Sequence, residues 1–544
     1  EMSASLVGSE MCIRDSLGVD AVDLLDGVSL PASSTLFVDS MLARTPALEA
    51  DRDAAFRRTV ERLDTLGKMD FTVPVSLKAT LRGYQVDGYQ WLGSLEHLGL
   101  GGILADDMGL GKTLQMIAHI LARVEAGDTK PTLVVCPASL VYNWTAELER
   151  FAPSLDVCAI VGAKAQRRVQ IAGVAEHNVV VTSYDLMRRD IDEYAEQDFA
   201  RAVLDEAQYI KNPLTQVARA AKRLPAGVRF ALTGTPIENR LSELWSIFDF
   251  LMPGLLGTRE SFAKRFESPV EHAEGDSAAR LQALVSPFVL RRVKEDVVAD
   301  LPEKIEDTVM AQLTGEQRKL YLANQDRIAQ QVQHRESSEF KKDKLKVLAE
   351  LTKLRQICCD PRLHYEDYKA GSAKLDTCME LVHGAHDGGH RILLFSQFTG
   401  MLDIIGKRLA KEDIVFLKLT GASSKESRAK MVAQFQAGEV PVFLISLKAG
   451  GVGLNLTAAD VVIHYDPWWN VAAQDQATDR AHRIGQQHTV TVYKLIAKDT
   501  IEERIMQMQE SKRDLVNSVL GGDGISSALF TREDVLALLG GDGR

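Results

Sequence analysis

The chain of 544 residues is too long for one ordinary hydrophobic core, so we expect two to four domains. Apolar residues make up 45% and charged residues 26%, and no apolar run reaches the ~18 residues of a membrane helix, so no membrane span is expected. The net charge of −11 disfavours an overall basic nucleic-acid binder but allows a local basic patch, and the six scattered cysteines argue against a disulfide framework or a zinc module.

The first residues do not read as part of a fold. The chain starts at Glu1, and Ser5–Ser16 (SLVGSEMCIRDS) resembles translated sequencing-adaptor read-through. We therefore interpret residues 1–16 as a sequence artefact and expect the natural protein to continue upstream. Residues 17–70 form a flanking segment, in which Ala47–Gly67 has helical periodicity.

Two stretches of the chain alternate short apolar runs with longer amphipathic segments, which is typical of buried parallel strands between helices. The predicted strands are Ile103–Ala105, Thr132–Cys136, Asn178–Thr182, Ala202–Leu204, Phe230–Leu232, Arg391–Phe395, Val415–Lys418, Val442–Ile445 and Val461–Tyr465. Between about Leu241 and Leu354 helices dominate, and Gln317–Arg355 has apolar residues at helical spacing. The sequence therefore predicts an α/β fold with two lobes and a helical insertion between them.

These patterns also set the expected domain boundaries. Lobe 1 covers residues 71–300, with a helical protrusion from about 240, and a helical linker covers 301–370. Lobe 2 covers residues 371–512, and a tail with short helices covers 513–544.

A phosphate-binding loop follows the first predicted strand. Asp106–Thr113 (DDMGLGKT) lies between Ile103–Ala105 and a predicted helix at Leu114–Arg123. Glycines let backbone N–H groups surround an anion, and the helix presents its positive end. Lys112 would contact the β- and γ-phosphates and the Thr113 hydroxyl would bind Mg²⁺. The first glycine of the general pattern G-x-x-x-x-G-K-[ST] is replaced by Asp106, so a glycine turn with a chance Lys-Thr remains the alternative.

An acidic pair ends another predicted strand. Ala202–Leu204 leads into Asp205–Gln208 (DEAQ), and the carboxyl end of a strand is where an open α/β sheet places ligand chemistry. Asp205 would hold Mg²⁺ and Glu206 would polarise the attacking water. An isolated Asp-Glu is often only a solvated helix start, but together with the Lys-Thr loop it predicts an ATP site.

Further segments complete a family resemblance. The segments are Leu81–Gln85 (LRGYQ), Asp107–Thr113, Asp205–Gln208, Leu232–Asn239 (LTGTPIEN), Ser446–Asp460 (SLKAGGVGLNLTAAD) and Gln476–Gln486 (QATDRAHRIGQ), in the order found in superfamily-two helicases. In detail the chain resembles Swi/Snf-type, chromatin-remodeller-like ATPases from about Leu77 to Lys512, including Leu290–Pro302 and Asp466–Asn470. It departs from many relatives at Val471, where they carry Pro, and at Gln208, where His is commoner.

The resemblance implies two RecA-like lobes, each a parallel sheet flanked by helices, that use ATP and Mg²⁺. It assigns nucleotide contacts to Gln85, Asp107, Met108, Gly109, Leu110, Gly111, Lys112, Thr113 and Gly453. Gln85 resembles an adenine-reading glutamine, although alone it would read as a polar helix residue. Arg480 and Arg483, three positions apart on one expected helix face, resemble arginine fingers, with a solvated basic face as the alternative. Hydrolysis is then expected to require closure of the two lobes.

The resemblance also implies contacts to the backbone of one strand of duplex DNA. These fall on Pro137, Ser139, Ser183, Tyr184, Ser396, Gln397, Ser446, Lys448, Gly450 and Trp469. Small residues and glycines after strands let backbone N–H groups approach phosphates, and a tryptophan can stack on a base. For Trp468 and Trp469 the alternative is packing within the lobe. Leu232–Pro236 is suited to sensing the γ-phosphate.

The resulting hypothesis is an ATP-dependent translocase on double-stranded DNA that remodels or displaces bound protein without separating the strands. An RNA-polymerase-recycling ATPase shares these features, and a DNA-binding scaffold with a silent ATPase is the alternative from another class. We expect a monomeric motor of prokaryotic type, in the cytoplasm and associated with the nucleoid.

Overall fold

The computed structural model describes residues 69–234, 241–268, 277–297, 302–333, 337–447, 456–468, 471–483 and 486–507, together with 535, 538 and 539. The chain divides into two compact units, with the boundary between Val298 and Ala299. The expectations for residues 1–16 and for the segment 17–68 lie outside the described residues, as does nearly all of the tail at 513–544.

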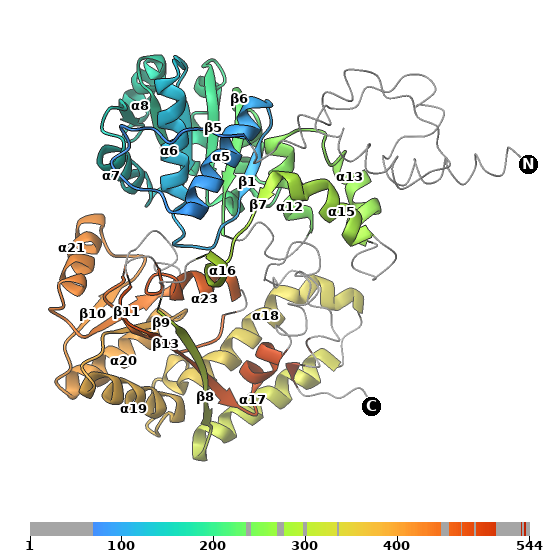
Figure 1. The fold of residues 1–544 in the computed structure, drawn as a ribbon. Coiled ribbons are helices and arrows are strands. Elements are labelled where there is room, and N and C mark those ends of the chain that lie inside the picture. The colour runs from blue at the N-terminus through green and yellow to red at the C-terminus, as the bar shows by residue number, and fades with distance from the viewer. Residues whose placement is uncertain are drawn as a thin grey trace, which may run out of the picture. The chain divides into compact units, whose positions relative to one another are not determined.

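Unit 1 contains a seven-stranded sheet in the order β3-β4-β2-β5-β6-β1-β7 (Figure 1). The strands are β1 (Gly102–Leu104), β2 (Thr132–Cys136), β3 (Val157–Ala159), β4 (Val179–Ser183), β5 (Phe199–Asp205), β6 (Ala226–Leu232) and β7 (Val289–Leu290). The recorded pairings between these strands are all parallel. In β2 and β4 every residue is buried, as expected for central strands covered by helices on both faces.

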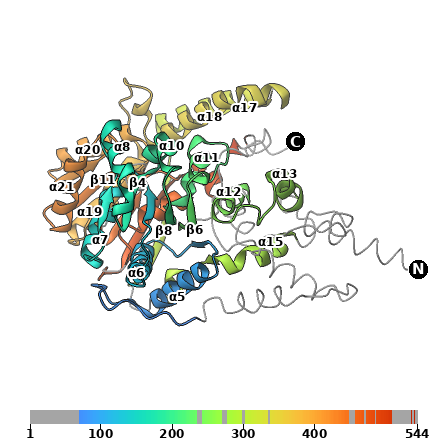
Figure 2. The same cartoon turned by 90° about the horizontal axis from the view of Figure 1, so that it is seen from above.

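The helices of unit 1 connect these strands and flank the sheet (Figure 2). They are α5 (Gly83–His97), α6 (Lys112–Glu125), α7 (Val141–Phe151), α8 (Lys164–Ala172), α9 (Tyr184–Arg189), α10 (Ile191–Tyr194), α11 (Gln216–Lys222), α12 (Leu241–Leu251), α13 (Arg259–Phe262), α15 (Ser277–Val285) and α16 (Lys294–Val297). The inner face of α6 buries Met116, Ile117, Ile120 and Leu121 completely or nearly so. Burial of such side chains stabilises the fold by about 1.5–3 kcal/mol each, so the core fixes where α6 begins.

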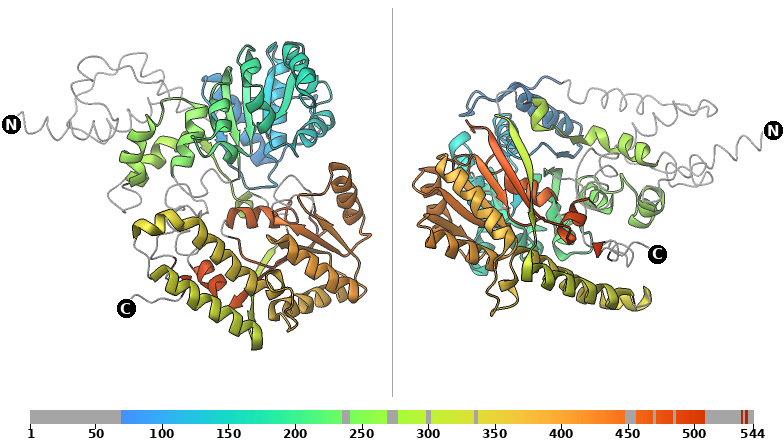
Figure 3. Two further views of the ribbon diagram at one scale, coloured as in Figure 1. Left: turned by 180° about the vertical axis from the view of Figure 1, so that it is seen from behind. Right: turned by 90° about the horizontal axis from the view of Figure 1, so that it is seen from below.

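Unit 2 contains a second sheet, which Figure 3 shows from behind and from below. It has six strands in the order β10-β11-β9-β12-β13-β8. The strands are β8 (Lys304–Gln312), β9 (Ile392–Ser396), β10 (Phe416–Leu419), β11 (Val442–Ser446), β12 (Val461–His464) and β13 (Val490–Lys498), again in parallel pairs. Its helices are α17 (Gly315–Gln333), α18 (Ser337–Cys359), α19 (Ala373–Asp387), α20 (Thr399–Lys411), α21 (Lys425–Gln436) and α23 (Val471–Thr478).

The predicted fold class is confirmed, since each unit is a parallel sheet flanked by helices. Along the sequence, helices dominate the stretch between β6 and β9. All nine predicted strands are present, with ends that shift by a few residues. The sequence patterns did not predict β3, β7, β8 or β13. The strand β8 is an edge strand whose residues are mostly exposed, so it lacks the apolar run that marks a buried strand.

Among the described residues, no helix combines the length and the hydropathy needed to cross a lipid bilayer.

Candidate nucleotide and nucleic-acid sites

Strand register in unit 1 gathers three predicted segments at one edge of the sheet. Leu104 at the end of β1 is the partner of Leu232 at the end of β6, and Leu232 is the partner of Asp205 at the end of β5. The phosphate-binding loop, Thr233 and the acidic pair therefore leave neighbouring strands at the same carboxyl edge. This is the edge where open α/β sheets bind ligands.

The loop between β1 and α6 has the conformation of an anion cradle. Gly109 and Gly111 have positive φ angles of 86° and 81°, a region that L side chains rarely adopt. A Cβ at Gly111 would also lie 2.5 Å from Nε2 of Gln85. Helix α6 starts directly after Gly111, with Lys112 and Thr113 in its first turn. The N–H groups of that turn give the site a positive end for phosphate.

Lys112 lies inside this loop. Its Nζ donates to the carbonyl oxygens of Asp106 and Asp107, the latter at 3.2 Å. Burial lowers the pKa of Lys112, against the opposing effect of nearby acidic groups that include Glu206 and Asp205. The ammonium is thus held by oxygen acceptors that phosphate oxygens can replace.

Asp205 is a partly buried carboxylate with several donors around it. Trp144 Nε1 donates to its Oδ2 at 2.8 Å, Glu206 N donates to its Oδ1 at 3.0 Å, and the Tyr184 hydroxyl donates to its main-chain oxygen at 2.9 Å. Burial, followed by the charge of Glu206, raises the pKa of Asp205 to about 7. Crowded carboxylate oxygens in a partly buried place suit a divalent cation, which would offset this charge. The donor set of Asp205 and Thr113, all hard oxygens, fits Mg²⁺.

A chain of hydrogen bonds joins Glu206 to the segment after β6. Gln208 Nε2 donates to Glu206 Oε2 at 2.8 Å, and the Thr233 hydroxyl donates to Gln208 Oε1 at 2.9 Å. Glu206 has a positive φ of 54°, an unfavourable conformation for a side chain of this kind. Gln208, noted in the sequence only as a departure from the commoner His, is therefore a bridge between Glu206 and Thr233.

Gln85 lies against the phosphate-binding loop. Its Nε2 donates to the carbonyl of Leu110 at 3.0 Å, and the Tyr84 hydroxyl donates to the same oxygen at 3.1 Å. Its Oε1 accepts from Arg82 N at 3.0 Å. Adenine recognition by Gln85 stays a prediction, and its amide is next to the loop that would hold the phosphates.

The DNA-contact candidates of unit 1 also lie together, because Cys136 before Pro137 is the register partner of Ser183. Ser139 is exposed, whereas Pro137 is buried and Ser183 is 3% exposed and caps α9. Tyr184 is 2% exposed and its hydroxyl is bonded to Asp205, which places this side chain with the acidic pair. The contact to a phosphate chain stays a prediction for all four.

In unit 2, Ser396 and Ser446 are register partners at the ends of β9 and β11. The Ser396 hydroxyl donates to Asp466, whose Oδ2 also accepts from Gln397 N at 3.2 Å. Arg355, on α18, donates to Gln397 Oε1 at 3.2 Å. The structure thus groups three of the unit 2 candidates at one strand edge.

The prediction that Arg480 and Arg483 lie on one face of a helix is wrong. Helix α23 ends at Thr478, and the main-chain oxygen of Arg480 accepts from Leu456 N at 3.0 Å instead of continuing the helix. Bonds from Arg480 N to the Ala477 oxygen and from Ala481 N to the Thr478 oxygen tighten the chain into turns at this point.

Four further candidates, Lys448, Gly450, Gly453 and Trp469, lie outside the described residues. Trp468 is described and packs against the core cluster that contains Phe395 and Ile445. This contact favours the packing alternative for Trp468.

Two residues that contact the site were not singled out in the sequence. Trp144 lies inside α7 and Arg292 follows β7, and each bonds to an aspartate far away in the sequence. Arg292 belongs to a segment quoted only as a family signature. No local pattern marks either partner, since both pairs form only when the sheet is assembled.

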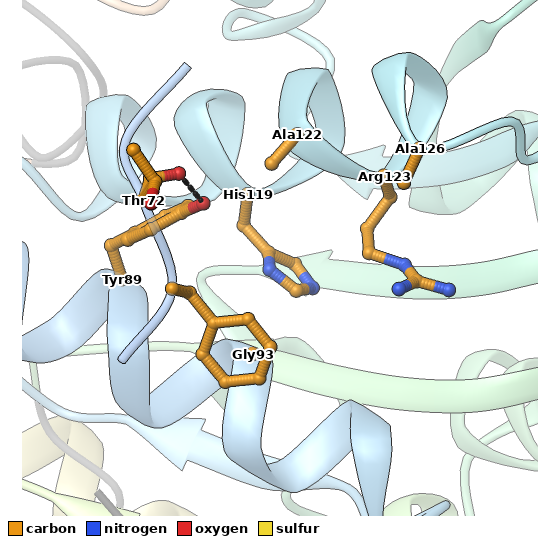
Figure 4. A pocket seen from close by; sticks show the side chains of 8 residues that line it. Thr72, Tyr89, Gly93, His119, Ala122, Arg123 and Ala126 are labelled. Carbon is orange, nitrogen blue, oxygen red and sulfur yellow. Dashed lines mark hydrogen bonds between the residues drawn. The ribbon is translucent and has the colours of Figure 1, made fainter. Parts of the chain in front are cut away.

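A pocket of about 180 Å³ in unit 1 is separate from this site (Figure 4). Its walls are α5, α6 and the segment around Thr72, with Tyr89 donating to the Thr72 oxygen at 2.9 Å. His119 and Arg123 face it from α6. None of the predicted nucleotide residues lines this pocket, so it is not the nucleotide site.

Comparison with known proteins gives two family matches. The SNF2-related domain matches residues 84–363, and the helicase conserved C-terminal domain matches residues 373–485. A Bacillus subtilis (strain 168) protein whose name gives it as an ATP-dependent helicase/translocase, YwqA, is 39% identical, over 95% of this chain and 58% of its own length. The TATA-binding protein-associated factor MOT1 of Saccharomyces cerevisiae is 34% identical, over 89% of this chain and 30% of its own length.

Among solved structures, the Sulfolobus solfataricus SWI2/SNF2 ATPase core in complex with dsDNA is 38% identical, with a TM-score of 0.44. The match covers 83% of this chain and 95% of that one. The chain spans about half the length of the bacterial curated relatives it matches and less than a third of MOT1.

Proposed function

The chain belongs to the SNF2-related family, as its motifs predicted, and on this premise we propose that it is the ATP-hydrolysing motor of a DNA translocase. The observation that carries the proposal is the common sheet edge of unit 1. There Lys112, the left-handed glycine loop and the Asp205–Glu206 pair leave neighbouring strands together.

The residues of unit 1 would divide the chemistry between them. Lys112 would exchange the carbonyls of Asp106 and Asp107 for phosphate oxygens. Asp205 with Thr113 would hold Mg²⁺, which would supply positive charge beside the phosphates. Glu206 accepts the hydrogen bond of Gln208 and orients the attacking water. The hydrogen bond from the Thr233 hydroxyl to Gln208 links Glu206 to the end of β6. Through this link, loss of the γ-phosphate would change the conformation at the end of that strand.

Arg480 and Arg483 remain our proposed arginine fingers. A guanidinium is always charged and planar, which suits the charge that develops on the transferring phosphoryl group. Both arginines follow the end of α23, and Arg480 lies in tight turns rather than on a helix. The backbone of Arg480 is held there by the hydrogen bond that its oxygen accepts from Leu456 N. Gly453 is kept as a nucleotide contact on the family resemblance alone.

The proposed track is the backbone of double-stranded DNA. Support comes from the Sulfolobus core, which was solved with dsDNA, and from the paired strand ends at Cys136/Ser183 and Ser396/Ser446. Backbone contacts read no sequence, so such a motor moves without base readout. The object displaced would be a DNA-bound protein, because one relative is named as a factor associated with the TATA-binding protein. We further propose a monomeric motor, associated with the nucleoid in the cytoplasm.

ATP hydrolysis with and without duplex DNA tests the motor. We expect stimulation by duplex DNA in the parent, and loss of hydrolysis by about a hundredfold or more in Lys112→Ala and Glu206→Gln. Parental rates in either variant would refute the assignment. A DNA-binding scaffold with a silent ATPase would bind duplex DNA but hydrolyse no ATP.

Translocation is tested by displacement of a triplex-forming strand from duplex DNA. Activity on forked DNA without triplex displacement would show a strand-separating helicase instead. The RNA-polymerase-recycling alternative predicts co-purification with RNA polymerase and release of the polymerase from DNA upon addition of ATP.

A further inference from the structure

The nucleotide loop is held from outside by a segment that comes from far along the chain. β7 pairs in parallel with β1, with Leu290 as the partner of Leu104. The pairing continues beyond the strands, because Ala105 N donates to the Leu290 oxygen at 2.7 Å and Asp107 N donates to the Arg292 oxygen at 2.9 Å. Lys294 N donates in turn to Asp107 Oδ2 at 3.2 Å. The first residues of the loop therefore form one bonded layer with residues 290–294.

The side chain of Arg292 adds further hydrogen bonds between residues 290–294 and the loop. Its Nε donates to Asp106 Oδ1 at 2.8 Å, and its Nη2 donates to Asp106 Oδ2 and to Gln115 Oε1, the latter at 2.8 Å. Nη1 donates to the main-chain oxygen of Tyr84, and the guanidinium lies 5.3 Å from the centre of the Tyr84 ring. Asp106 is fully buried, and 12% of the Arg292 side chain is exposed.

Gln115 and Gly88 complete the arrangement. Gln115, buried on α6, donates to Asp106 Oδ2 at 3.1 Å while it accepts from Arg292. Gly88 leaves the room for both, because a Cβ there would clash with Gln115 Oε1 and lie 2.6 Å from Arg292 Nη2. Three elements that are distant in sequence thus meet at the position where the general loop pattern has a glycine.

We propose that Arg292 is a positioning residue of the nucleotide site, which holds the phosphate-binding loop through Asp106. The same two residues, Asp106 and Asp107, supply the carbonyl oxygens that hold Lys112. Because Arg292 fixes the carboxylate of Asp106, it also fixes the position of the Lys112 ammonium group before phosphate binds. In this role Arg292 contacts the loop, Gln115 and Tyr84, and it acts on the nucleotide through the loop alone.

Holding Asp106 in this way requires the planar guanidinium of arginine, which donates several hydrogen bonds at once. A lysine would keep the positive charge beside Asp106 but could not reach both carboxylate oxygens, Gln115 and the Tyr84 oxygen at once. Arg292→Lys therefore loosens the loop without leaving a buried charge unpaired. Gly88→Ala displaces the same guanidinium from the opposite side and changes no charge at all.

The test measures binding of a non-hydrolysable ATP analogue with Mg²⁺, together with KM, kcat and thermal unfolding. Arg292→Lys and Gly88→Ala should each raise the dissociation constant and KM for ATP about tenfold, with kcat within about twofold of the parent. The double variant should lose little more than either single variant, because both act on one cluster. The matched control is Gly384→Ala, a helical glycine of α19 whose added Cβ would meet nothing within 4 Å.

Parental affinity in Arg292→Lys and Gly88→Ala would overturn the inference, even if both variants unfold at lower temperature, because the cluster would then be purely structural. Independent, multiplying effects in the double variant would also overturn it. If one variant does not fold, the other decides. The inference rests on the proposed ATP site, so the parent and Lys112→Ala are measured first. A parent that binds no analogue refutes the site itself, whereas normal parental binding with unaffected variants refutes only the part assigned to Arg292.

Discussion

The indole nitrogen of Trp144 donates a hydrogen bond of 2.8 Å to Oδ2 of Asp205 across 61 positions of sequence. Trp144 is fully buried on α7, so its ring cannot turn away from this carboxylate. The bond counteracts the burial and the charge of Glu206, which together raise the pKa of Asp205. Trp144 thereby favours the ionised form that would bind Mg²⁺.

Trp144→Phe should therefore weaken the metal dependence of the motor. Phenylalanine keeps most of the packing but removes the donor, so the pKa of Asp205 should rise further. Loss of such an outer partner typically costs 10–100-fold in metal affinity, and we expect about tenfold more Mg²⁺ at half-maximal ATPase rate. Trp245→Phe, which removes an indole bond to the Gly257 oxygen elsewhere in unit 1, is the control. An unchanged Mg²⁺ dependence in Trp144→Phe would contradict the assignment.

The bridge from Glu206 through Gln208 to Thr233 predicts coupled losses. Gln208→Leu and Thr233→Val should each lower the DNA-stimulated ATPase rate about fivefold, the loss that corresponds to one neutral hydrogen bond of ~1 kcal/mol. Their combination should lower it little further, because each variant breaks the same chain. Gln208→His should keep most of the rate, since an imidazole also offers one donor and one acceptor. Additive losses would mean that the two residues act separately.

A buried cluster in unit 1 predicts acid sensitivity. Glu96 bonds to His119 and Arg201, and although burial raises its pKa, these partners hold the pKa at about 2. Because the folded pKa lies below the ordinary 4.5, the stabilisation is complete above about pH 4.5 and is lost as the pH falls toward 2. Glu96→Gln should destabilise unit 1 by about 3 kcal/mol at pH 7 and leave Arg201 with one acidic partner fewer.

Hydrogen exchange of amides in α5 and α6, followed from pH 7 to pH 3, measures this effect for unit 1 separately. The difference between the parent and Glu96→Gln should shrink toward acid pH. A difference that stayed constant over this range would show that the charge of Glu96 does not contribute.

Unit 2 contains a fully buried ion pair, for which we predict that a double variant is more stable than a single variant. Lys374 Nζ lies 2.5 Å from Glu502 Oε2, and neither side chain is exposed. Lys374→Met leaves Glu502 uncompensated and should destabilise unit 2 by about 3–5 kcal/mol, whereas Lys374→Met with Glu502→Gln should recover a large part of that loss. Exchange of the amides of α19 gives the free energy of opening. A double variant no more stable than Lys374→Met would show that the pair is not the source of the loss.

The parts of the fold that the sequence predicted are those marked locally. Central strands such as Thr132–Cys136 and Val442–Ile445 are continuous apolar runs, and burial on both faces demands such runs. The edge strand β8 carries Lys304, Glu306 and Asp307 and is mostly exposed, so its pairing with β13 leaves no local signal. β7 is only two residues long, and neither period nor composition can mark a strand of that length.

The site divides in the same way. Glycines that need positive φ, a Lys-Thr at a helix start and an acidic pair after a strand are written in adjacent residues, so Gly109, Lys112 and Asp205 could be predicted. The contacts of Trp144 and Arg292 depend on which strands become neighbours. The helix expected around Arg480 failed for a similar reason, because the bond from Leu456 that ends it comes from outside the local segment.

The pairing of β8 with β13 also has a consequence for the way in which unit 2 is made. Among the described residues of unit 2, β8 is the first strand and β13 is the last, and nine consecutive residues of each are paired. During synthesis β8 must wait, with both edges unpaired, until almost the whole unit has left the ribosome. Such distant pairing slows folding and exposes a strand edge to other chains. The charges along β8 would then act as protection during this interval, keeping nascent copies of the motor from pairing with one another.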